Sequence, residues 1–337
     1  MSTILEELFI EIGERSDWPE CYDKVEIVRS RIDSYANKII EKYDPIQMWD
    51  FKRQVERWLD NIDDVDEKFM LLNSLTYFTF FNRDHYEALY REALNGAITQ
   101  WLIDINRIDI CTMSLDADIE KAIGSTLFSA ATDSMEISAF CHTNGITNKN
   151  RPVWFGVVDK EDTLEQLEQK ANEWSAQLKR WGRKQVVVLE DFIGSGNQIR
   201  PLIYFLASMY EFKTLIVPLT ICPQGNYAIR EYIKQKELKN IFYAPVTVLP
   251  DDLVLGKDNE DRNEILIRLK EFAQNYHDKV VGTSQRTTAP TYLGFGDIGA
   301  LFAKYTNCPN NSLPLFWYGE NVDWAPLFRR NERKNDG

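Results

Sequence analysis

The stretch 186–198 constrains the fold of this 337-residue chain more than any other. It begins with an unbroken apolar run, Val-Val-Val-Leu, which predicts a strand buried on both faces of a parallel sheet. The carboxylates Glu190 and Asp191 follow, then a loop of small residues, and then apolar residues at helical spacing from Gln198 to Tyr210. Small residues let backbone N–H groups converge on an anion, and a helix N-terminus adds partial positive charge. The stretch therefore predicts a phosphate-binding strand, loop and helix.

This stretch resembles the phosphoribosyl-diphosphate motif of the phosphoribosyltransferases, in which four hydrophobic residues and two acids precede a loop containing a hydroxyl residue and a glycine. Glu190 and Asp191 match the acidic pair, and Ser195 stands in the hydroxyl position, whereas Gln198 replaces the usual threonine. The resemblance implies that a 5′-phosphate lies against the loop formed by Phe192, Ile193, Gly194, Ser195, Gly196, Asn197 and Gln198. The plain alternative is an acidic loop after a buried strand in some other α/β domain.

The same resemblance gives Glu190 and Asp191 the catalytic role. They would stabilise the ribose as positive charge develops at C1′, and they would hold Mg²⁺, directly or through water. We expect both acids to be poorly buried, because they stand at the end of a strand.

Length, net charge and cysteine content limit the classes of protein to which this chain can belong. The length predicts two domains, which we place at 1–112 and 113–337. A formal net charge of −13 argues against general affinity for nucleic acid or an anionic membrane. Five scattered cysteines indicate reduced thiols rather than a disulfide frame or a zinc site. No apolar run approaches the roughly 20 residues that span a bilayer, and nothing near the N-terminus reads as a signal peptide. We therefore expect a cytoplasmic protein.

The region before residue 110 predicts an all-helical N-terminal extension. Apolar spacing and capping residues indicate helices over 3–14, from 16–20 to about 43, from 44–45 to 59, over 63–81 and over 84–105. The aromatic residues between Phe69 and Phe81 favour a bundle core, and a face that docks a partner or a second copy of the chain is the alternative.

From residue 127 onward, strand and helix patterns alternate. Strands are expected over 127–131, 153–158, 186–189, 213–221 and 241–249, and helices over 135–142, 163–181, 198–210, 226–237 and 261–276. Pro218 indicates an edge strand or a bulge. The alternation predicts an α/β, phosphoribosyltransferase-like fold: a mostly parallel sheet flanked by helices, with ligand at the carboxyl ends of the strands.

The residues after the first of these strands are Thr132, Asp133 and Ser134. The resemblance implies a loop here that contacts pyrophosphate, although the usual glycines are missing. The alternative is a helix cap made by Asp133 or Ser134. The polar segment 144–152 is expected to be a mobile loop over the site.

The C-terminal tail is rich in Asn, Pro and aromatic residues. Asn310 and Asn311 either direct amides into the ligand pocket or fix a turn, and Phe316 and Trp317 are expected to seal the domain edge. With the acidic pair and its loop, the tail resembles the phosphoribosyltransferase-like family of bacterial conflict systems, which includes effectors of retron anti-phage systems. This resemblance covers residues 115–330.

The family resemblance implies a toxic effector that acts on phosphoribosyl diphosphate or a nucleotide, by transfer or by N-glycosidic hydrolysis. It also implies partners: a reverse transcriptase with its RNA or DNA, a DNA-binding protein from the same operon, or a second copy of the chain. The alternative is a non-catalytic nucleotide-sensing or assembly subunit that keeps the phosphate loop. Gln198 and the missing glycines at 132–134 favour that alternative.

Overall fold

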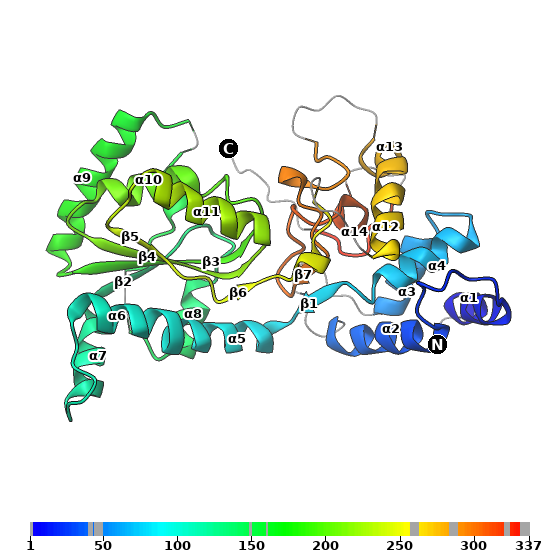
Figure 1. Cartoon of the computed structure of the whole chain (residues 1–337), viewed down its shortest axis with the longest axis horizontal. Coiled ribbons are helices and arrows are strands. Elements are labelled where there is room, and N and C mark those ends of the chain that lie inside the picture. The colour runs from blue at the N-terminus through cyan, green and yellow to red at the C-terminus, as the bar shows by residue number, and fades with distance from the viewer. Residues whose placement is uncertain are drawn as a thin grey trace. The chain divides into compact units, whose positions relative to one another are not determined.

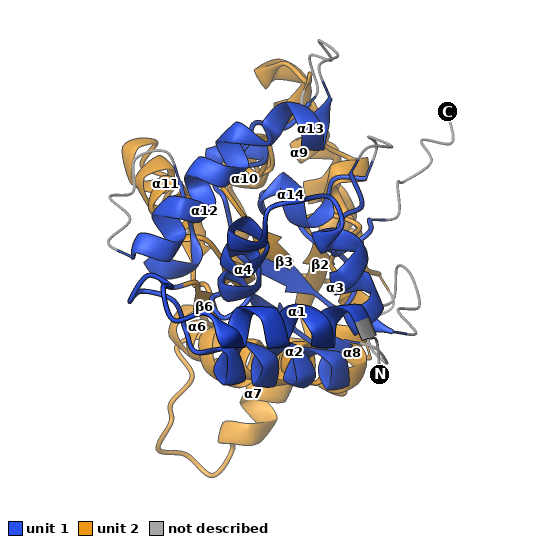
Figure 2. Ribbon diagram, turned by 90° about the vertical axis from the view of Figure 1, so that its right-hand side faces the viewer, with its two compact units in different colours: residues 1–83, 250–337 blue, residues 84–249 orange. Residues whose placement is uncertain are grey.

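The computed structural model describes residues 3–39, 43, 50–147, 150–159, 161–256, 263–282, 289–319 and 324–330. The chain forms two compact units: residues 1–83 with 250–337 (unit 1), and residues 84–249 (unit 2) (Figure 2). These units differ from the expected division at residue 112, because residues 250–337 belong to the same unit as the first 83 residues.

Unit 2 contains one parallel sheet. Its strands are ordered β2 (Thr126–Ala130), β3 (Gln185–Ile193), β4 (Lys213–Ile221) and β5 (Ile241–Tyr243), and β6 (Thr247–Val248) pairs with the last residues of β4. The register sets Ala130 beside Leu189 and Glu190 beside Pro218. All four residues of the apolar run 186–189 are fully buried, as a strand covered on both faces requires.

Helices cover both faces of this sheet (Figure 1). One side carries α9 (Leu164–Arg180), α10 (Arg200–Ser208) and α11 (Pro223–Gln235), and the other carries α5 (Arg83–Glu92), α6 (Thr99–Asn106) and α8 (Ile137–Thr143). A π-helical turn, η1 (Ala93–Ile98), joins α5 to α6, and α7 (Leu115–Gly124) leads into β2. The expected α/β class, a mostly parallel sheet flanked by helices, is confirmed.

Three strand expectations in unit 2 are wrong, and two of them involve proline. Pro218 lies in β4, an interior strand rather than an edge, at the point where its neighbour changes from β5 to β6. The run 241–249 is broken into β5 and β6, because Pro245 between them lacks an N–H group. Pairing with β4 resumes after Pro245, where the Val246 N–H donates to the carbonyl of Pro218 at 2.8 Å. The missing proline N–H groups thus divide what the sequence indicates as one strand.

The expected strand at 153–158 is instead a 3₁₀ turn, η2 (Trp154–Gly156), with a single bridge from Val153 to Ala130. Trp154 is fully buried and packs edge-on against Trp174, and its indole N–H donates to Ser129 Oγ at 2.7 Å. The apolar run therefore supplies a core side chain rather than a sheet partner.

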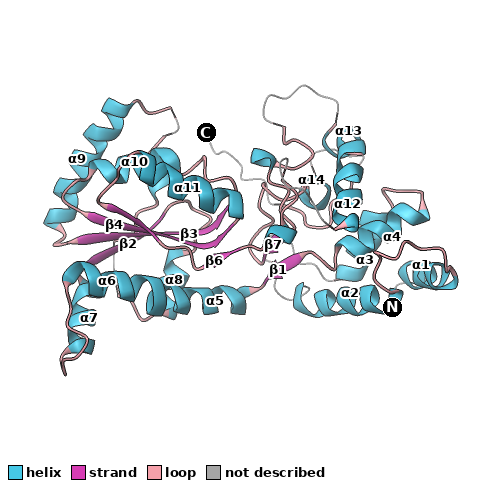
Figure 3. Cartoon of the chain, in the orientation of Figure 1, coloured by secondary structure: helices cyan, strands magenta, loops and turns pink. Residues whose placement is uncertain are grey.

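Unit 1 is mainly helical (Figure 3). Its helices and turns are α1 (Thr3–Glu14), α2 (Val25–Ile39), α3 (Phe51–Leu59), α4 (Val65–Ser74), η3 (Asp251–Leu253), α12 (Glu264–Asn275), α13 (His277–Val281), η4 (Phe295–Asp297) and α14 (Pro314–Trp317). Residues 16–20 form a turn rather than a helix start, with the Trp18 indole donating to the Ile12 carbonyl at 2.9 Å. The helix start expected at 44–45 lies outside the described residues.

The helix expected over 63–81 ends at Ser74, and its last residues form a strand, β1 (Thr79–Phe81). This strand pairs in parallel with β7 (Phe302–Lys304), so the N-terminal region is helical apart from β1. The pairing with a distant segment replaces the helix that the local apolar pattern favours.

Aromatic side chains form the core of unit 1. Phe78 stacks on Phe328 with 5.0 Å between ring centroids and lies 4.8 Å from Phe316, and the Trp58 indole donates to the Leu315 carbonyl at 2.9 Å. Phe78 and Trp58 are thus buried against the C-terminal tail, as part of a core. Within the described chain, no helix is both long and apolar enough to span a bilayer.

Candidate functional site

Strand β3 carries the acidic pair to the carboxyl edge of the sheet in unit 2, where ligands of parallel α/β folds bind. Glu190 is 6% exposed and Asp191 is 3% exposed, so the expectation that both acids are poorly buried is wrong. The strand continues past the acids to Ile193 and pairs with β4 along this part, which contributes to their burial.

The loop after β2 binds the first acid. The Thr132 N–H donates to Glu190 Oε2 at 3.0 Å, and the Thr132 hydroxyl donates to Glu190 Oε1 at 2.7 Å. A buried carboxylate is stable only when donors satisfy it, and here one residue supplies two of them. Thr132, expected only by position and resemblance, therefore lies against the acidic pair.

The same loop binds the second acid. The Ser134 hydroxyl donates to Asp191 Oδ1 at 3.1 Å, and the Phe192 N–H donates to the same oxygen at 2.7 Å. The hydroxyl oxygens of Thr132 and Ser134 are 2.7 Å apart, so the two contacts form one network. Asp133 between them is exposed. Hydroxyl groups thus hold the loop where the family's glycines are absent.

The segment after β3 forms the expected loop, 194–199, and leads into α10. Of the expected phosphate-binding residues, Phe192 and Ile193 belong to the strand, and the Ile193 carbonyl accepts from the Cys222 N–H at 2.9 Å. In the part of the chain that the structure describes, the N–H groups of Ser195, Gly196 and Gln198 donate to no protein acceptor. Unsatisfied N–H groups beside a helix N-terminus attract an anion.

The Cα atom of Gly196 packs against α11, and the residue offers a ligand only its N–H group. Its φ is +75°, and a Cβ atom here would lie 3.2 Å from both the Gly225 carbonyl oxygen and Ile229 Cγ1. Gly196 is also buried, so a larger side chain would strain the packing against α11 instead of covering an exposed anion position.

Sequence reasoning missed two residues that shape this site. A Cβ atom on Gly225 would lie 2.2 Å from the Gly194 carbonyl oxygen, so only glycine allows the backbone of α11 to approach the loop this closely. The Tyr86 hydroxyl on α5 donates to the Asp191 carbonyl at 3.3 Å. The Pro-Gln-Gly turn at 223–225 was a visible signal for the first, whereas nothing local marks Tyr86.

Cys222 is the thiol next to the loop, and it is fully buried. Burial raises the pKa of this thiol well above its ordinary value, so it stays protonated at neutral pH. Since the thiolate is the nucleophilic form, Cys222 contributes packing and not covalent catalysis.

The burial of both carboxylates limits how the acidic pair could hold a magnesium ion. Mg²⁺ keeps several water molecules and needs open carboxylate oxygens, whereas both of these carboxylates are buried and accept hydrogen bonds from protein donors. Among the described residues, no three His, Cys, Asp or Glu side chains gather as a metal site. The role of Glu190 and Asp191 as magnesium ligands stays a prediction.

Asn310 and Asn311 belong to unit 1, and their hydrogen bonds hold a turn there. The Asn310 carbonyl accepts from the Phe295 N–H at 2.9 Å, and Asn311 Nδ2 donates to the Phe295 carbonyl at 2.6 Å. Phe316 and Trp317 are buried in the same unit. Of the residues expected at the site, unit 2 therefore brings together 132–134 and 190–198.

Comparison with known families agrees with this geometry. The sequence model of the family described as PRTase-CE, a phosphoribosyltransferase-like family, matches residues 55–330. The match begins well before residue 115, so the expected extent of the resemblance was too short, and helices before the sheet are included. Searches of curated proteins and of solved structures found no match. With its parallel sheet and with a match over most of its length, the chain belongs to the PRTase-CE family of phosphoribosyltransferase-like proteins.

Proposed function

We propose that unit 2 binds the 5′-phosphate of a phosphoribosyl compound or nucleotide at loop 194–199. The observation that supports this most directly is that the N–H groups of Ser195, Gly196 and Gln198, beside the N-terminus of α10, have no acceptor among the described residues. Backbone donors at a helix N-terminus are a general means of holding phosphate. Ser195, half-buried in the same loop, supplies a hydroxyl to the same ligand group.

In the enzymatic form of this proposal, the chain transfers or hydrolyses the bond at C1′ of the ribose. Glu190 and Asp191 then act through their buried negative charge, which favours positive charge developing on the sugar. Thr132 and Ser134 keep the carboxylates in place, so that no reorganisation is needed during the reaction.

A second function is supported by the same hydrogen bonds. Both carboxylates already accept from protein donors, which suits a nucleotide sensor that binds phosphate without acting on the sugar. Titration calorimetry with phosphoribosyl diphosphate and with ribose 5-phosphate, each with and without Mg²⁺, measures binding. Chromatography of the incubated ligands measures turnover, and binding without turnover selects the sensor.

Ser195→Ala tests the loop itself. Losing one hydroxyl donor should weaken binding by about 1–2 kcal/mol, because the N–H groups remain. Thr112→Ala, at an exposed turn of the same unit, is the matched control and should bind as the wild type does. Wild-type protein that binds neither ligand would leave the family assignment standing and remove the phosphate site.

The biological setting is part of the proposal. We place the chain as an effector of bacterial anti-phage defence, of the retron type, on the resemblance stated for its tail and loop. Its partners would then be a reverse transcriptase with its RNA or DNA, a DNA-binding protein from the same operon, or a second copy of the chain. Phage challenge of cells carrying the operon with Glu190→Gln and Asp191→Asn together should show lost protection, provided that the variant protein accumulates normally. Full protection with this double variant would contradict the site.

A further inference from the structure

The edge of the sheet in unit 2 at which the strands begin is strongly basic. Because β3, β4 and β5 are parallel, the turns that lead into them lie together at this edge, at the other end of the strands from the acidic pair and loop 194–199 (Figure 1). We call residues 179–184, 210–213 and 234–239 the basic edge. They include eight Lys or Arg residues and two Glu residues, a formal charge of +6 in a chain whose net charge is −13.

Contacts between the three turns hold them as one surface. The Lys179 ammonium pairs with Glu211, which joins the first turn to the second. Asn240 Nδ2 donates to the Phe212 carbonyl at 3.3 Å, and the Thr214 N–H donates to the Asn240 carbonyl at 2.8 Å. These two hydrogen bonds join the second turn to the third. The basic residues are therefore carried by turns that are fixed relative to one another.

Helix ends explain only some of these cations. Lys179, Arg180 and Lys234 lie in the last turns of α9 and α11, where a cation complements the partial negative charge of a helix C-terminus. Three other lysines lie beyond the last helical turn, at or just before the start of a strand: Lys184, Lys213 and Lys239. Their position at this edge has no such explanation from the helix ends.

Most of the positive charge at the basic edge is not neutralised by neighbouring acids. Lys179 pairs with Glu211, and Lys234 lies 4.0 Å from Glu231. Five cations are exposed and form no ion pair with any described residue: Arg180, Lys184, Lys213, Lys236 and Lys239. Exposed like charges repel one another, and a bound polyanion removes that repulsion.

The net negative charge of the chain does not cancel this local charge. At physiological ionic strength, salt screens exposed charges beyond about 8 Å, so a ligand in contact with the basic edge interacts mainly with the charges of that edge. The basic surface ends on the side of β2, because α7, which leads into this strand, carries Asp116, Asp118 and Glu120.

An exposed aromatic ring lies within the basic edge. Tyr210 is 78% exposed and lies three residues before Lys213, in the turn between α10 and β4. A nucleobase stacks on such a ring while phosphates contact the cations beside it. The edge consists of turns and helix ends, so it offers neither the side of a helix nor a two-stranded ribbon to the groove of a duplex. These features favour a single strand over a duplex.

We infer that the basic edge binds single-stranded nucleic acid, RNA or DNA, with phosphates at its five exposed cations and a base stacked on Tyr210. This edge and loop 194–199 lie at opposite ends of the strands. The inference therefore does not depend on the proposed function of the loop.

Fluorescence anisotropy with the full chain measures this binding. The probes are oligo(U) and oligo(dT) of about 12 nucleotides, labelled at the 3′ end and carrying a 5′ hydroxyl, so that no terminal phosphate binds loop 194–199. The probe that binds more tightly identifies the sugar, and it should bind at least tenfold more tightly than a duplex of the same length. The logarithm of its binding constant should fall with the logarithm of the salt concentration with a slope of about −3.5, because each of five neutralised phosphates of a single strand contributes about −0.7.

Two kinds of variant separate charge from stacking. Arg180→Gln, Lys184→Gln and Lys213→Gln together should lower the affinity at least tenfold and reduce the salt slope by about 2. Tyr210→Ala should lower the affinity at least fivefold and leave the slope unchanged, because it removes a stacking partner and no charge. Tyr210→Phe keeps the ring and should bind as the wild type does. Melting curves of each variant establish that it is folded.

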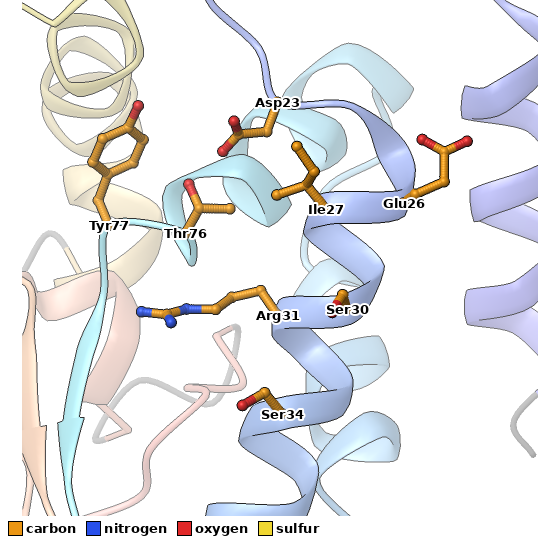
Figure 4. Close-up of a pocket in the computed structure, with 8 residues that line it drawn as sticks. All are labelled: Asp23, Glu26, Ile27, Ser30, Arg31, Ser34, Thr76 and Tyr77. Atoms are coloured by element: carbon orange, nitrogen blue, oxygen red, sulfur yellow. The ribbon is translucent and has the colours of Figure 1, made fainter.

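The α2 region of unit 1 supplies the matched control, because its charges are mixed. The open depression beside α2 has both Arg31 and Asp23 among its lining residues (Figure 4). Lys24 and Lys38 lie just before and within α2, Arg57 lies in α3, and all three are exposed. Lys24→Gln, Lys38→Gln and Arg57→Gln together change the net charge by the same amount as the triple variant of the basic edge. This control should bind the probes as the wild type does.

Ser195→Ala should leave oligonucleotide binding unchanged, which distinguishes the basic edge from the phosphate loop. Three results would overturn the inference: no binding of either oligonucleotide to the wild type at low salt, tighter binding of the duplex than of both single strands, or equal losses of affinity in the two triple variants.

Discussion

Single side chains decide how the acidic pair is held. Glu190 and Asp191 lie next to each other in sequence, yet both are bound by hydroxyls of one loop, Thr132 and Ser134. Because the carboxylates are buried, each lost donor leaves charge without hydration, and this makes the hydroxyls matter for stability as well as for ligand binding.

Thr132→Val tests this arrangement, since valine keeps the shape of threonine and removes only the hydroxyl. The backbone N–H of residue 132 still reaches Glu190, so we expect a loss of about 1–3 kcal/mol in the free energy of unfolding. Urea denaturation followed by circular dichroism measures it. Thr112→Val, at an exposed turn, should change stability by no more than about 0.5 kcal/mol. Equal losses in the free energy of unfolding for the two variants would mean that the hydrogen bond from the Thr132 hydroxyl to Glu190 does not contribute to stability.

Gly196 and Gly182 have a similar backbone conformation but different surroundings. Substitutions at the two positions therefore distinguish the free-energy cost of the backbone conformation from the cost of poor packing. Gly196 and Gly182 have φ of +75° and +67°, but a Cβ atom meets atoms of α11 at 3.2 Å only at Gly196, and nothing within 4 Å at Gly182. Gly182→Ala should therefore cost about 1 kcal/mol, the penalty of the left-handed conformation alone. Gly196→Ala should cost more and should also weaken binding to the phosphate loop. Unfolding and titration of the two variants provide the comparison, and a larger cost at Gly182 would argue against the packing role.

Among the elements, α9 shows how a local signal fixes a helix end. Thr163 caps the helix through a reciprocal pair of bonds with Gln166, and Asp162 just before it accepts from Lys170 Nζ at 2.6 Å and from the Asp159 N–H at 2.7 Å. The hydrogen bond from Lys170, followed by the backbone bond, lowers the pKa of Asp162 below its ordinary value. The Asp162 carboxylate therefore stabilises the first turn of α9 through its hydrogen bonds to Lys170 and to the Asp159 N–H.

This shift makes the stability of unit 2 depend on pH. Because the pKa of Asp162 is lower in the folded state, its contribution is fully present above the unfolded value of about 4 and is lost as pH falls through the folded value. Asp162→Asn should lower Tm at pH 7, where the contribution is fully present, and should flatten the fall of Tm below about pH 4. Scanning calorimetry across this range measures it. Lys170→Gln should flatten the curve in the same way, and a wild-type slope in both variants would exclude the pair as its source.

At the scale of the whole molecule, the chain divides by packing and not by sequence order. Residues 84–249 are continuous and hold the complete parallel sheet with its core, whereas unit 1 needs both ends of the chain. A break near residue 115 would remove β1 from β7 and the ring of Phe78 from Phe316.

Fragment 83–249 should therefore fold cooperatively on its own and should bind phosphoribosyl ligands as the whole chain does. Fragment 115–337 should not give a cooperative unfolding transition, because it lacks half of the core of unit 1 and also lacks α5 and α6, which cover one face of the sheet in unit 2. Urea denaturation and calorimetry of the two fragments test this. A cooperative fragment 115–337 alongside an unfolded fragment 83–249 would show that the domains follow the boundary at 112 instead.

Elements whose signals are local can be predicted from the amino-acid sequence alone. The strand at 213–221, the helix around 164–180 and the acidic pair at the carboxyl end of a buried strand all follow from periodicity, capping and turn residues in one stretch of chain. The family resemblance depended on the same kind of signal, a contiguous motif. The class of fold then followed from the alternation of strands and helices.

Which distant residues meet can be seen only in the folded chain. Nothing near Thr79 indicates that it pairs with Phe302, and the apolar run around it favours a helix until that partner is present. The burial of Glu190 likewise depends on Thr132, and the position of Gly194 depends on Gly225. The physical reason is that periodicity tells a segment which face is apolar, whereas the identity of the covering segment is set by packing and hydrogen bonds across the folded chain.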